Sequence, residues 1–312
     1  MNKIKVGVVG VGHLGIHHAR IYSELPETEL VGIVDIDTER AKKVAEPLDV
    51  PYYGDFDTFA EKHSLDAVSI VVPTVGHFEI AKNAIKRGLN VLVEKPVTTT
   101  VEQAEELLKL SSDRGTVLQV GHIERFNSAV VNAKEFITDP IFIQTKRIGP
   151  FTSRISDVGV VLDLMIHDID IILSMVNAEL VSMSAVGRRV RTDHEDIASV
   201  QLRFDNGTLA HILVSRVSEK RERIMEVTEA ERFVTVNFET QDMTIRHCIS
   251  GTDGRMTEVS EHPIFPKKEP LKMELQHFID CIKYGKQPMV GIKDGKRALE
   301  VCVEALKQIN GM

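Results

Sequence analysis

An aspartate and a histidine four residues apart in an apolar stretch are the side chains of this sequence best placed to do chemistry. Asp163 and His167 lie in the segment VGVVLDLMIHDIDIIL, residues 158–173. Helical spacing puts the two on one face, with neighbouring side chains about 5–6 Å apart. A carboxylate and an imidazole among apolar residues cost free energy unless they are paired or used. The segment alone leaves two interpretations open: a buried pair that satisfies its own hydrogen bonds, or a functional pair.

Proton transfer is the chemistry available to such a pair. Imidazole changes charge near neutral pH, so His167 can act as a general base, and Asp163 can orient it or bind a neighbouring hydroxyl. A metal site is disfavoured, because no second histidine lies at ligand spacing near His167. We therefore expect no metal ion.

A glycine-rich turn near the N-terminus predicts a binding site for a dinucleotide. The apolar run Ile4–Val9 ends in GVGHLG, residues 10–15, and Ile16–Leu25 follows with helical character. In G-x-G-x-x-G the first glycine makes a tight turn, the second lets the backbone approach a pyrophosphate, and the third allows close packing of helix on strand. The phosphates then lie at the helix N-terminus, which favours negative charge. The predicted contacts are Gly10, Gly12, His13, Leu14 and Gly15.

An acidic residue after the next apolar run indicates which cofactor binds. Leu30–Val34 has the composition of a second buried strand, and Asp35 follows it, 20 residues after Gly15. A carboxylate there accepts hydrogen bonds from the adenosine ribose and repels a 2′-phosphate, so NAD is favoured over NADP. Arg40 tempers this preference, since it could turn toward a phosphate. A plain capping or turn role for Asp35 also stays open.

Strands and helices alternate through the first 120 residues. The predicted elements after Asp35 are Ala67–Val72, Gly76–Arg87, Asn90–Glu94, Val101–Ser112 and Thr116–Val120. Such alternation predicts a doubly wound parallel sheet, a Rossmann fold, with helices on both faces. Ligands of these sheets bind beyond the carboxyl ends of the strands. Pro73, Thr74 and His77 are therefore candidates for cofactor contact, although His77 could equally be an ordinary residue at a helix start.

A lysine ends another of these strands. Glu94, Lys95 and Pro96 directly follow the buried run VLV, residues 91–93. The proline restricts the backbone of Lys95 to extended geometry, which holds the ammonium group at the sheet edge where ligands bind. On position alone, a solvated surface lysine is an equal alternative.

The alternation stops after Val120, and strand-like segments then follow one another directly. They are Ile141–Arg147, Leu180–Gly187, Ala198–Phe204, Thr208–Ser215, Arg223–Val227, Arg232–Phe238 and Met243–His247. Strands without crossover helices predict an open, mostly antiparallel sheet with a helix over 159–176 on one face. Two closing helices are expected over 269–284 and 293–308. The predicted fold is thus α/β: a NAD-binding Rossmann domain over 1–121 and an α+β domain for substrate binding and oligomerisation over 122–312.

Length and composition fit this plan. The chain has 312 residues, of which 43% are hydrophobic, so a substantial core is possible. The net charge of −8 argues against a binder of nucleic acid or anionic membranes. The three cysteines form no C-x-x-C pair, and no run of about 18 uncharged apolar residues occurs. The glycine-rich stretch VGVVGVG is too short for a secretory signal, so we expect a cytoplasmic protein.

The chain resembles the glucose-fructose oxidoreductase, inositol dehydrogenase and MocA-like (Gfo/Idh/MocA) family of NAD(P)-dependent oxidoreductases. The resemblance rests on GVVGVGHLG, Asp35, VVPTVGHFE, VEKPV and DLMIHDID in this order, and on ELQHFIDCIKYGKQP near the C-terminus. It implies that Lys95 and His167 face the nicotinamide and that Asp163 belongs to the catalytic site. Glu94 is then a cofactor contact beside Lys95.

A narrower resemblance begins at GHIERFN, residues 121–127. Together with Arg147, Gly149, Pro150 and the segment around His167, it is similar to the sugar-nucleotide 3-dehydrogenases. These enzymes oxidise the 3-hydroxyl of UDP-N-acetylglucosamine or of its uronic acid. A nucleotide diphosphate needs cationic or N–H donors. The implied substrate contacts are Lys95, Arg125, Asn127, Arg154, Asp163 and His167.

The sequence therefore predicts an NAD-dependent oxidation of a UDP-amino sugar by hydride transfer. Either His167 or Lys95 is the proton acceptor. Dehydrogenation of an inositol or a free sugar is the alternative, and a non-catalytic nucleotide or sugar sensor is a third possibility. Because family members associate through the open sheet, the resemblance also implies a homodimer or homotetramer, with no nucleic-acid or membrane partner.

Overall fold

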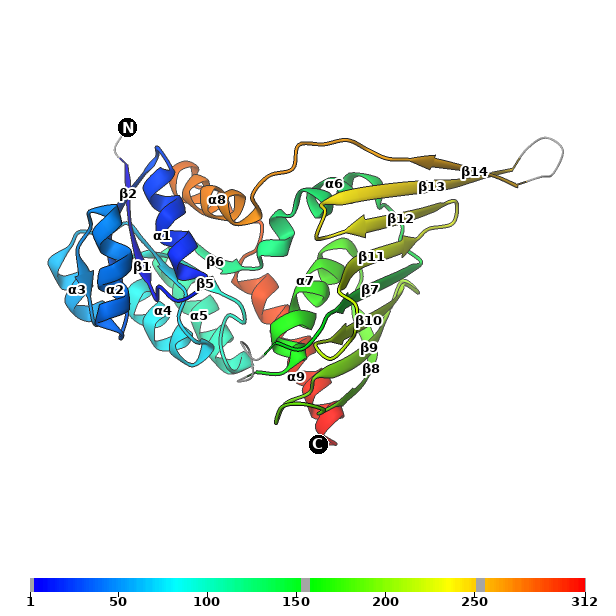
Figure 1. Ribbon diagram of the computed structural model, residues 1–312, viewed down its shortest axis with the longest axis horizontal. Helices are drawn as coiled ribbons and strands as arrows, with labels where there is room; N and C mark the ends of the chain where they lie inside the picture. The colour runs from blue at the N-terminus through cyan, green and yellow to red at the C-terminus, as the bar shows by residue number, and fades with distance from the viewer. Residues whose placement is uncertain (1–2, 153–157, 251–255, 312) are drawn as a thin grey trace. The chain divides into compact units, whose positions relative to one another are not determined.

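Two separate sheets organise the chain (Figure 1). The computed structural model describes residues 3–152, 158–250 and 256–311. Unit 1 comprises Met1–Ile123 and Pro270–Arg297, and unit 2 comprises Glu124–Glu269 and Ala298–Met312. The domain boundary placed after residue 121 from the sequence stays a prediction. Within the described residues, no helix combines the length and the apolar composition needed to cross a bilayer.

Unit 1 is built on a parallel sheet with the strand order β3-β2-β1-β4-β5-β6. The order reverses between β1 and β4, and the crevice beyond the carboxyl ends of such neighbours is where doubly wound sheets bind ligands. The predicted Rossmann fold is confirmed. Its strands are β1 (Ile4–Val9), β2 (Thr28–Val34), β3 (Tyr52–Tyr53), β4 (Ala67–Ile70), β5 (Asn90–Glu94) and β6 (Leu118–Gly121).

The helices of unit 1 cover both faces of this sheet, which explains why β4 is buried at every residue and β5 at every residue after Asn90. One of them, α8, comes from far along the chain, and its Leu275 and Phe278 share an apolar core with Ile21 of α1. The helices are α1 (Gly15–Glu24), α2 (Thr38–Ala45), α3 (Phe56–Lys62), α4 (His77–Lys86), α5 (Val101–Arg114) and α8 (Pro270–Tyr284), with the short 3-10 helices η1 (Glu46–Leu48) and η2 (Thr74–Gly76).

Unit 2 contains the second sheet, in the order β14-β13-β12-β11-β7-β10-β9-β8. Among the pairings that the structure describes, β7 with β10 is parallel and the others are antiparallel. The predicted open, mostly antiparallel sheet is confirmed. Its strands are β7 (Phe142–Ile148), β8 (Leu180–Arg188), β9 (Ile197–Phe204), β10 (Leu209–Ser215), β11 (Glu222–Thr228), β12 (Arg232–Asn237), β13 (Asp242–Ser250) and β14 (Met256–Glu261).

Helices of unit 2 pack on one face of this sheet and form its core. They are α6 (Ser128–Phe136), η4 (Val161–Met165), α7 (Ile166–Met175) and the last part of α9 (Ile292–Asn310), while η3 (Ile123–Phe126) precedes α6 at the boundary between the units. The helix expected over 159–176 is present, but its first turn, η4, is a π-helix rather than an α-helix. A π-turn inserts one extra residue into a helix, and such turns are frequent at functional sites. Asp163 lies inside it.

Candidate active site

The glycine loop between β1 and α1 has the geometry that a bound pyrophosphate requires. Gly10 has a φ of +88°, and a Cβ there would lie 2.5 Å from the carbonyl oxygen of Val71. A Cβ on Gly15 would overlap the carbonyl oxygen of Gly10. At Gly12 a Cβ would meet nothing within 4 Å, so the backbone there borders open space. Packing requires the first and third glycines, whereas the second leaves access for a ligand, and the loop fits a dinucleotide.

Asp35 lies beside this loop and is tied to it. Its carboxylate accepts the N–H of Val11 at 2.9 Å and the N–H of Asp37 at 2.9 Å, and Arg40 Nη2 is 3.2 Å away. Asp37, not Asp35, caps α2, since its side chain accepts the N–H of Arg40. The carboxylate predicted to bind the ribose is therefore fixed by two backbone donors, while the Arg40 side chain is 44% exposed.

Lys95 follows β5 at the same edge of the sheet and is partly exposed. Its N–H lies 3.3 Å from Glu94 Oε2. The His77 ring bridges the two loops on either side: Nδ1 is 2.9 Å from the carbonyl oxygen of Pro96, and Nε2 is 2.9 Å from that of Val72. Burial lowers the pKa of His77, against the smaller opposing effect of these carbonyls. A neutral imidazole has one N–H, so the ring donates to one of these two carbonyl oxygens. His77 thus lies between the backbone after β4 and the backbone that carries Lys95.

All of the predicted cofactor contacts lie in unit 1, at or beyond the carboxyl ends of four neighbouring strands. Pro73 and Thr74 form the start of η2 after β4. His13 is exposed in the glycine loop, with its ring centroid 6.0 Å from that of His17. Leu14 directly precedes α1. The structure thus brings these residues together along one sheet edge.

The aspartates and the histidine of η4 and α7 fall into two groups by their exposure to solvent. Asp163 and His167 are partly exposed, whereas Asp168 is 0% and Asp170 is 2% exposed. The two buried aspartates bind arginines from other segments of the unit, Asp168 to Arg147 and Asp170 to Arg125. The residues expected to act on a substrate are therefore those that solvent reaches.

A buried ion triad fixes the inner side of α7. Arg147 Nη2 donates to Asp168 Oδ1 at 2.9 Å and Nε to Oδ2 at 3.1 Å, while Nη1 donates to Glu124 Oε1 at 2.8 Å. The guanidinium carbon also lies 4.9 Å from the ring centroid of Phe238. Burial alone would lower the pKa of Arg147, but Asp168 and Glu124 raise it above its ordinary value. Such a bidentate pair sets both the position and the rotation of the helix.

The GHIERFN segment supplies further contacts inside unit 2. Arg125 Nη1 lies 3.3 Å from Asp170 Oδ1. Asn127 Nδ2 donates to the carbonyl oxygen of Phe238 at 2.9 Å, and Asn127 caps α6. Their predicted contact with substrate stays a prediction, as does that of Arg154, which lies outside the described residues. What the structure shows is that this motif anchors the helix of Asp163 and His167.

Sequence reasoning did not single out the residues that hold this helix: Glu124, Glu195, Asp196 and Arg216. Each is a charged residue that is buried or nearly so. The resemblance points to Arg147 and Arg125, but it gives neither of them a role in holding this helix. One signal in the sequence could have indicated buried partners. A charged residue stands at a buried position of an alternating strand pattern, as at Arg147 in β7, or directly after such a strand, as at Arg216 after β10.

A doubly wound parallel sheet with this glycine loop, joined to a second unit with an open sheet, defines a dinucleotide-binding oxidoreductase. A family model described as oxidoreductase family, NAD-binding Rossmann fold, matches residues 4–122, and the GFO/IDH/MocA C-terminal domain matches residues 138–257. The chain belongs to the GFO/IDH/MocA family, and NAD is its cofactor.

Relatives within the family align from end to end. A UDP-N-acetylglucosamine 3-dehydrogenase of Acidithiobacillus ferrooxidans is 34% identical over 316 residues, covering 99% of this chain and 100% of that protein. A solved structure of the enzyme of that name and species has a TM-score of 0.93 at 32% identity, covering 100% and 99%. The scyllo-inositol 2-dehydrogenase (NAD(+)) of Bacillus subtilis is 30% identical over 336 residues, covering 100% and 96%.

Proposed function

We propose that the protein oxidises the 3-hydroxyl of UDP-N-acetylglucosamine, or of its uronic acid, to a 3-keto sugar with NAD. The observation that carries this proposal is the end-to-end similarity to a UDP-N-acetylglucosamine 3-dehydrogenase, in sequence and in fold. The partly exposed Asp163, His167 and Lys95 supply the polar groups that the oxidation of an alcohol requires.

The chain's own residues handle the hydroxyl group. NAD, when bound, takes the hydride from the carbon that bears it. His167 accepts the hydroxyl proton, and Asp163 orients the imidazole or binds a neighbouring hydroxyl. Lys95 donates a hydrogen bond to the oxygen that becomes a carbonyl, and its positive charge favours alkoxide character there. The reverse assignment, with Lys95 as the proton acceptor, is the alternative within the same scheme.

The cofactor is held by the edge of the unit 1 sheet. Gly12 leaves space for the pyrophosphate at the start of α1. Asp35 accepts from the ribose hydroxyls, and its negative charge disfavours a 2′-phosphate. Pro73, Thr74, His77 and Glu94 line the same edge nearer to Lys95. This arrangement supports NAD rather than NADP.

The test is the formation of NADH with a panel of substrates. Purified protein with NAD should reduce it in the presence of UDP-N-acetylglucosamine or its uronic acid, with hydroxylamine added to trap the ketone and draw the oxidation forward. The second candidate, an inositol dehydrogenase, is favoured by the similarity to the scyllo-inositol enzyme. If NADH forms with scyllo-inositol but with neither UDP-sugar, the second proposal replaces the first.

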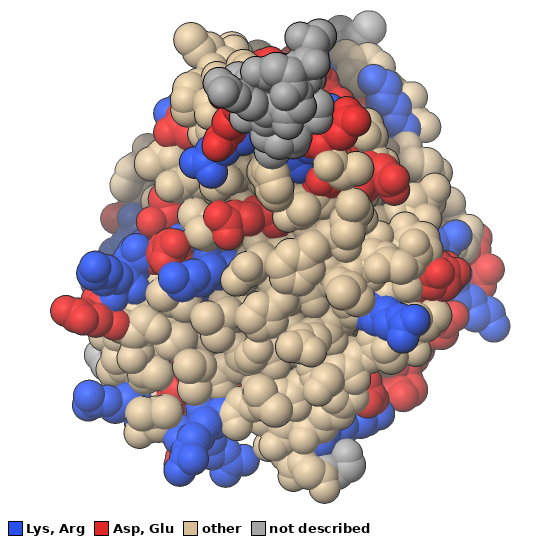
Figure 2. Space-filling model, turned by 90° about the vertical axis from the view of Figure 1, so that its right-hand side faces the viewer, with Lys and Arg blue, Asp and Glu red and all other residues tan. Residues whose placement is uncertain are grey.

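We also propose a homodimer or homotetramer that associates through the sheet of unit 2. Figure 2 shows that the outer side of this sheet carries a broad area with few charged side chains. Val186, Leu209 and Phe233 are exposed by 65%, 47% and 42%, and each alternates with residues that are buried in the core. Apolar area of this kind favours a protein partner. A light-scattering mass of one chain at micromolar concentration would contradict it.

A further inference from the structure

One glutamate from a loop distant in the sequence binds the start of the π-helical turn that carries Asp163. The first N–H groups of a helix have no partners within it. Here Glu195 accepts two of them: its main-chain oxygen accepts the N–H of Val160 at 3.0 Å, and its side-chain Oε1 accepts the N–H of Val161 at 3.0 Å. Glu195 is only 8% exposed. One residue thus fixes both the backbone and the direction of the helix start.

Gly159 connects this anchor to Asp163. A Cβ on Gly159 would overlap the Glu195 carboxylate, so the carboxylate packs directly on the chain at this point. The carbonyl oxygen of the same glycine accepts the N–H of Asp163 at 3.1 Å. Gly159 therefore links the two residues, and a movement of Glu195 would move the backbone of Asp163.

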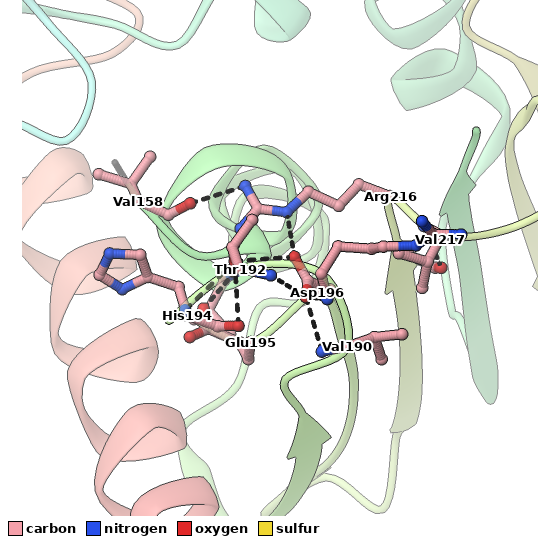
Figure 3. Close-up of polar contacts among 11 residues, drawn as sticks. Val158, Val190, Thr192, His194, Glu195, Asp196, Arg216 and Val217 are labelled. Atoms are coloured by element: carbon pink, nitrogen blue, oxygen red, sulfur yellow. Dashed lines mark hydrogen bonds and ion pairs between the residues drawn. The ribbon is translucent and has the colours of Figure 1, made fainter. Parts of the chain in front are cut away.

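The loop that bears Glu195 is held rigidly by its neighbour (Figure 3). Asp196 is 0% exposed, and its Oδ2 accepts the N–H groups of Val190, Arg191 and Thr192 at 2.7, 2.6 and 3.0 Å. Burial would raise the pKa of Asp196, but these N–H groups and Arg216 hold it well below its usual value. Arg216 Nε donates to Asp196 Oδ1 at 2.7 Å. The backbone next to Glu195 is thus held in place by the hydrogen bonds that the charged Asp196 carboxylate accepts.

Arg216 also reaches the other side of the helix start. Its Nη1 donates to the carbonyl oxygen of Val158 at 2.8 Å, one residue before Gly159, and its Nη2 donates to Thr192 Oγ1 at 2.7 Å. Figure 3 shows the guanidinium lying between Val158 and Asp196. The chain that enters the π-turn is therefore held by Glu195 on one side and by Arg216 on the other.

We propose that Glu195 is a positioning residue that sets the geometry of the Asp163–His167 pair, an inference that rests on the proposed function of that pair. The extra residue of the π-turn changes the angle at which Asp163 leaves the helix relative to His167. Without the side-chain acceptor at Val161, the turn loses the bond that fixes this start. Misplacement of a reacting group by about 1 Å can cost on the order of 100-fold in rate.

The experiment compares Glu195→Ala, which removes the acceptor, with Glu195→Gln, which keeps an oxygen at Oε1. Asp55→Ala is the matched control, because Asp55 caps α3 through the N–H of Thr58 at 2.8 Å and takes no part in the site. Two kinds of measurement are made on each variant. The first is steady-state kinetics, which gives kcat and KM, and the second is the imidazole resonances of His167 in a histidine-labelled sample, assigned with His167→Asn.

Glu195→Ala should lower kcat by on the order of 100-fold, leave the KM for NAD unchanged and shift the His167 resonances. Glu195→Gln should show wild-type kcat and wild-type His167 resonances, and Asp55→Ala should leave kcat, KM and the resonances unchanged. Wild-type kcat and resonances in Glu195→Ala, or equal damage in Glu195→Gln, would overturn the inference. The resonances report on His167 whether or not the protein oxidises a sugar nucleotide. A failure of the proposed function is therefore distinguishable from a failure of this inference.

Discussion

Replacing Asp168 by asparagine should destabilise unit 2 strongly, although the residue is next to His167 in sequence. Asp168 is 0% exposed, and both of its carboxylate oxygens accept hydrogen bonds from Arg147, whose side chain is 2% exposed. Asparagine keeps one acceptor oxygen but has no charge, and its amide group cannot accept the second bond. The Arg147 guanidinium then stays buried with Glu124 as its described carboxylate partner.

The size of the effect follows from that remaining partner. Removing one member of a buried ion pair costs about 3–5 kcal/mol, because the other charge is left uncompensated. Glu124 still binds Arg147 at 2.8 Å, so we expect the lower end of the range, about 3 kcal/mol. With a urea m-value of about 3 kcal/mol/M, the midpoint of unfolding should fall by about 1 M.

Urea titration followed by circular dichroism measures this midpoint, with Asp163→Asn as the control. Asp163 is partly exposed, so its replacement should change the free energy of unfolding by no more than about 0.5 kcal/mol while lowering kcat. A wild-type midpoint in Asp168→Asn, at an unchanged m-value, would refute the structural role of the triad. So would a midpoint loss in Asp163→Asn as large as that in Asp168→Asn.

Three further outcomes are expected. His167→Asn should lower kcat by roughly two to four decades if the imidazole is the general base, and near-normal NADH formation would remove that role. Gly12→Ala should fold normally, because a Cβ there meets no atom of the protein within 4 Å, yet weaken NAD binding about tenfold or more, measured by NADH fluorescence, because the Cβ would crowd the proposed pyrophosphate site. The lowered pKa of Asp196 means that its carboxylate stabilises the folded state above about pH 4 and less as the pH falls further. The difference in unfolding free energy between wild type and Asp196→Asn should therefore shrink from about pH 5 to pH 2, and a constant difference would contradict this account.

Local sequence patterns predicted most strands of both sheets, but not β3 or β14, and they predicted the edge of the first sheet where we expect the cofactor. The strand, glycine turn and helix at residues 4–24 follow from the spacing of apolar residues and from the backbone conformation of Gly10. The position of Asp35 after the second strand follows in the same way. These features depend on residues close together in the chain, whose periodicity and turn chemistry act over a few positions.

The membership of α8 in unit 1 and the π-helical form of the first turn at Asp163 were not predictable from the sequence. A helical pattern of apolar residues says that one face is buried, but not against which element. Likewise, a regular pattern does not distinguish one extra residue in a turn when the anchor of that turn comes from elsewhere. Packing between distant segments decides both.

The sequence by itself determined which residues are available for chemistry: the glycine loop, Asp35, Lys95, and an aspartate and a histidine on one helix. Only the tertiary structure decided which aspartates of that helix are structural, since their partners are distant. Asp168 and Arg147 are 21 positions apart, Asp170 and Arg125 are 45 apart, and Glu195 lies 34 from the helix start that it anchors. A buried charge must find a counter-charge within a few ångströms. Which segment supplies it is set by the fold, not by neighbours in the chain.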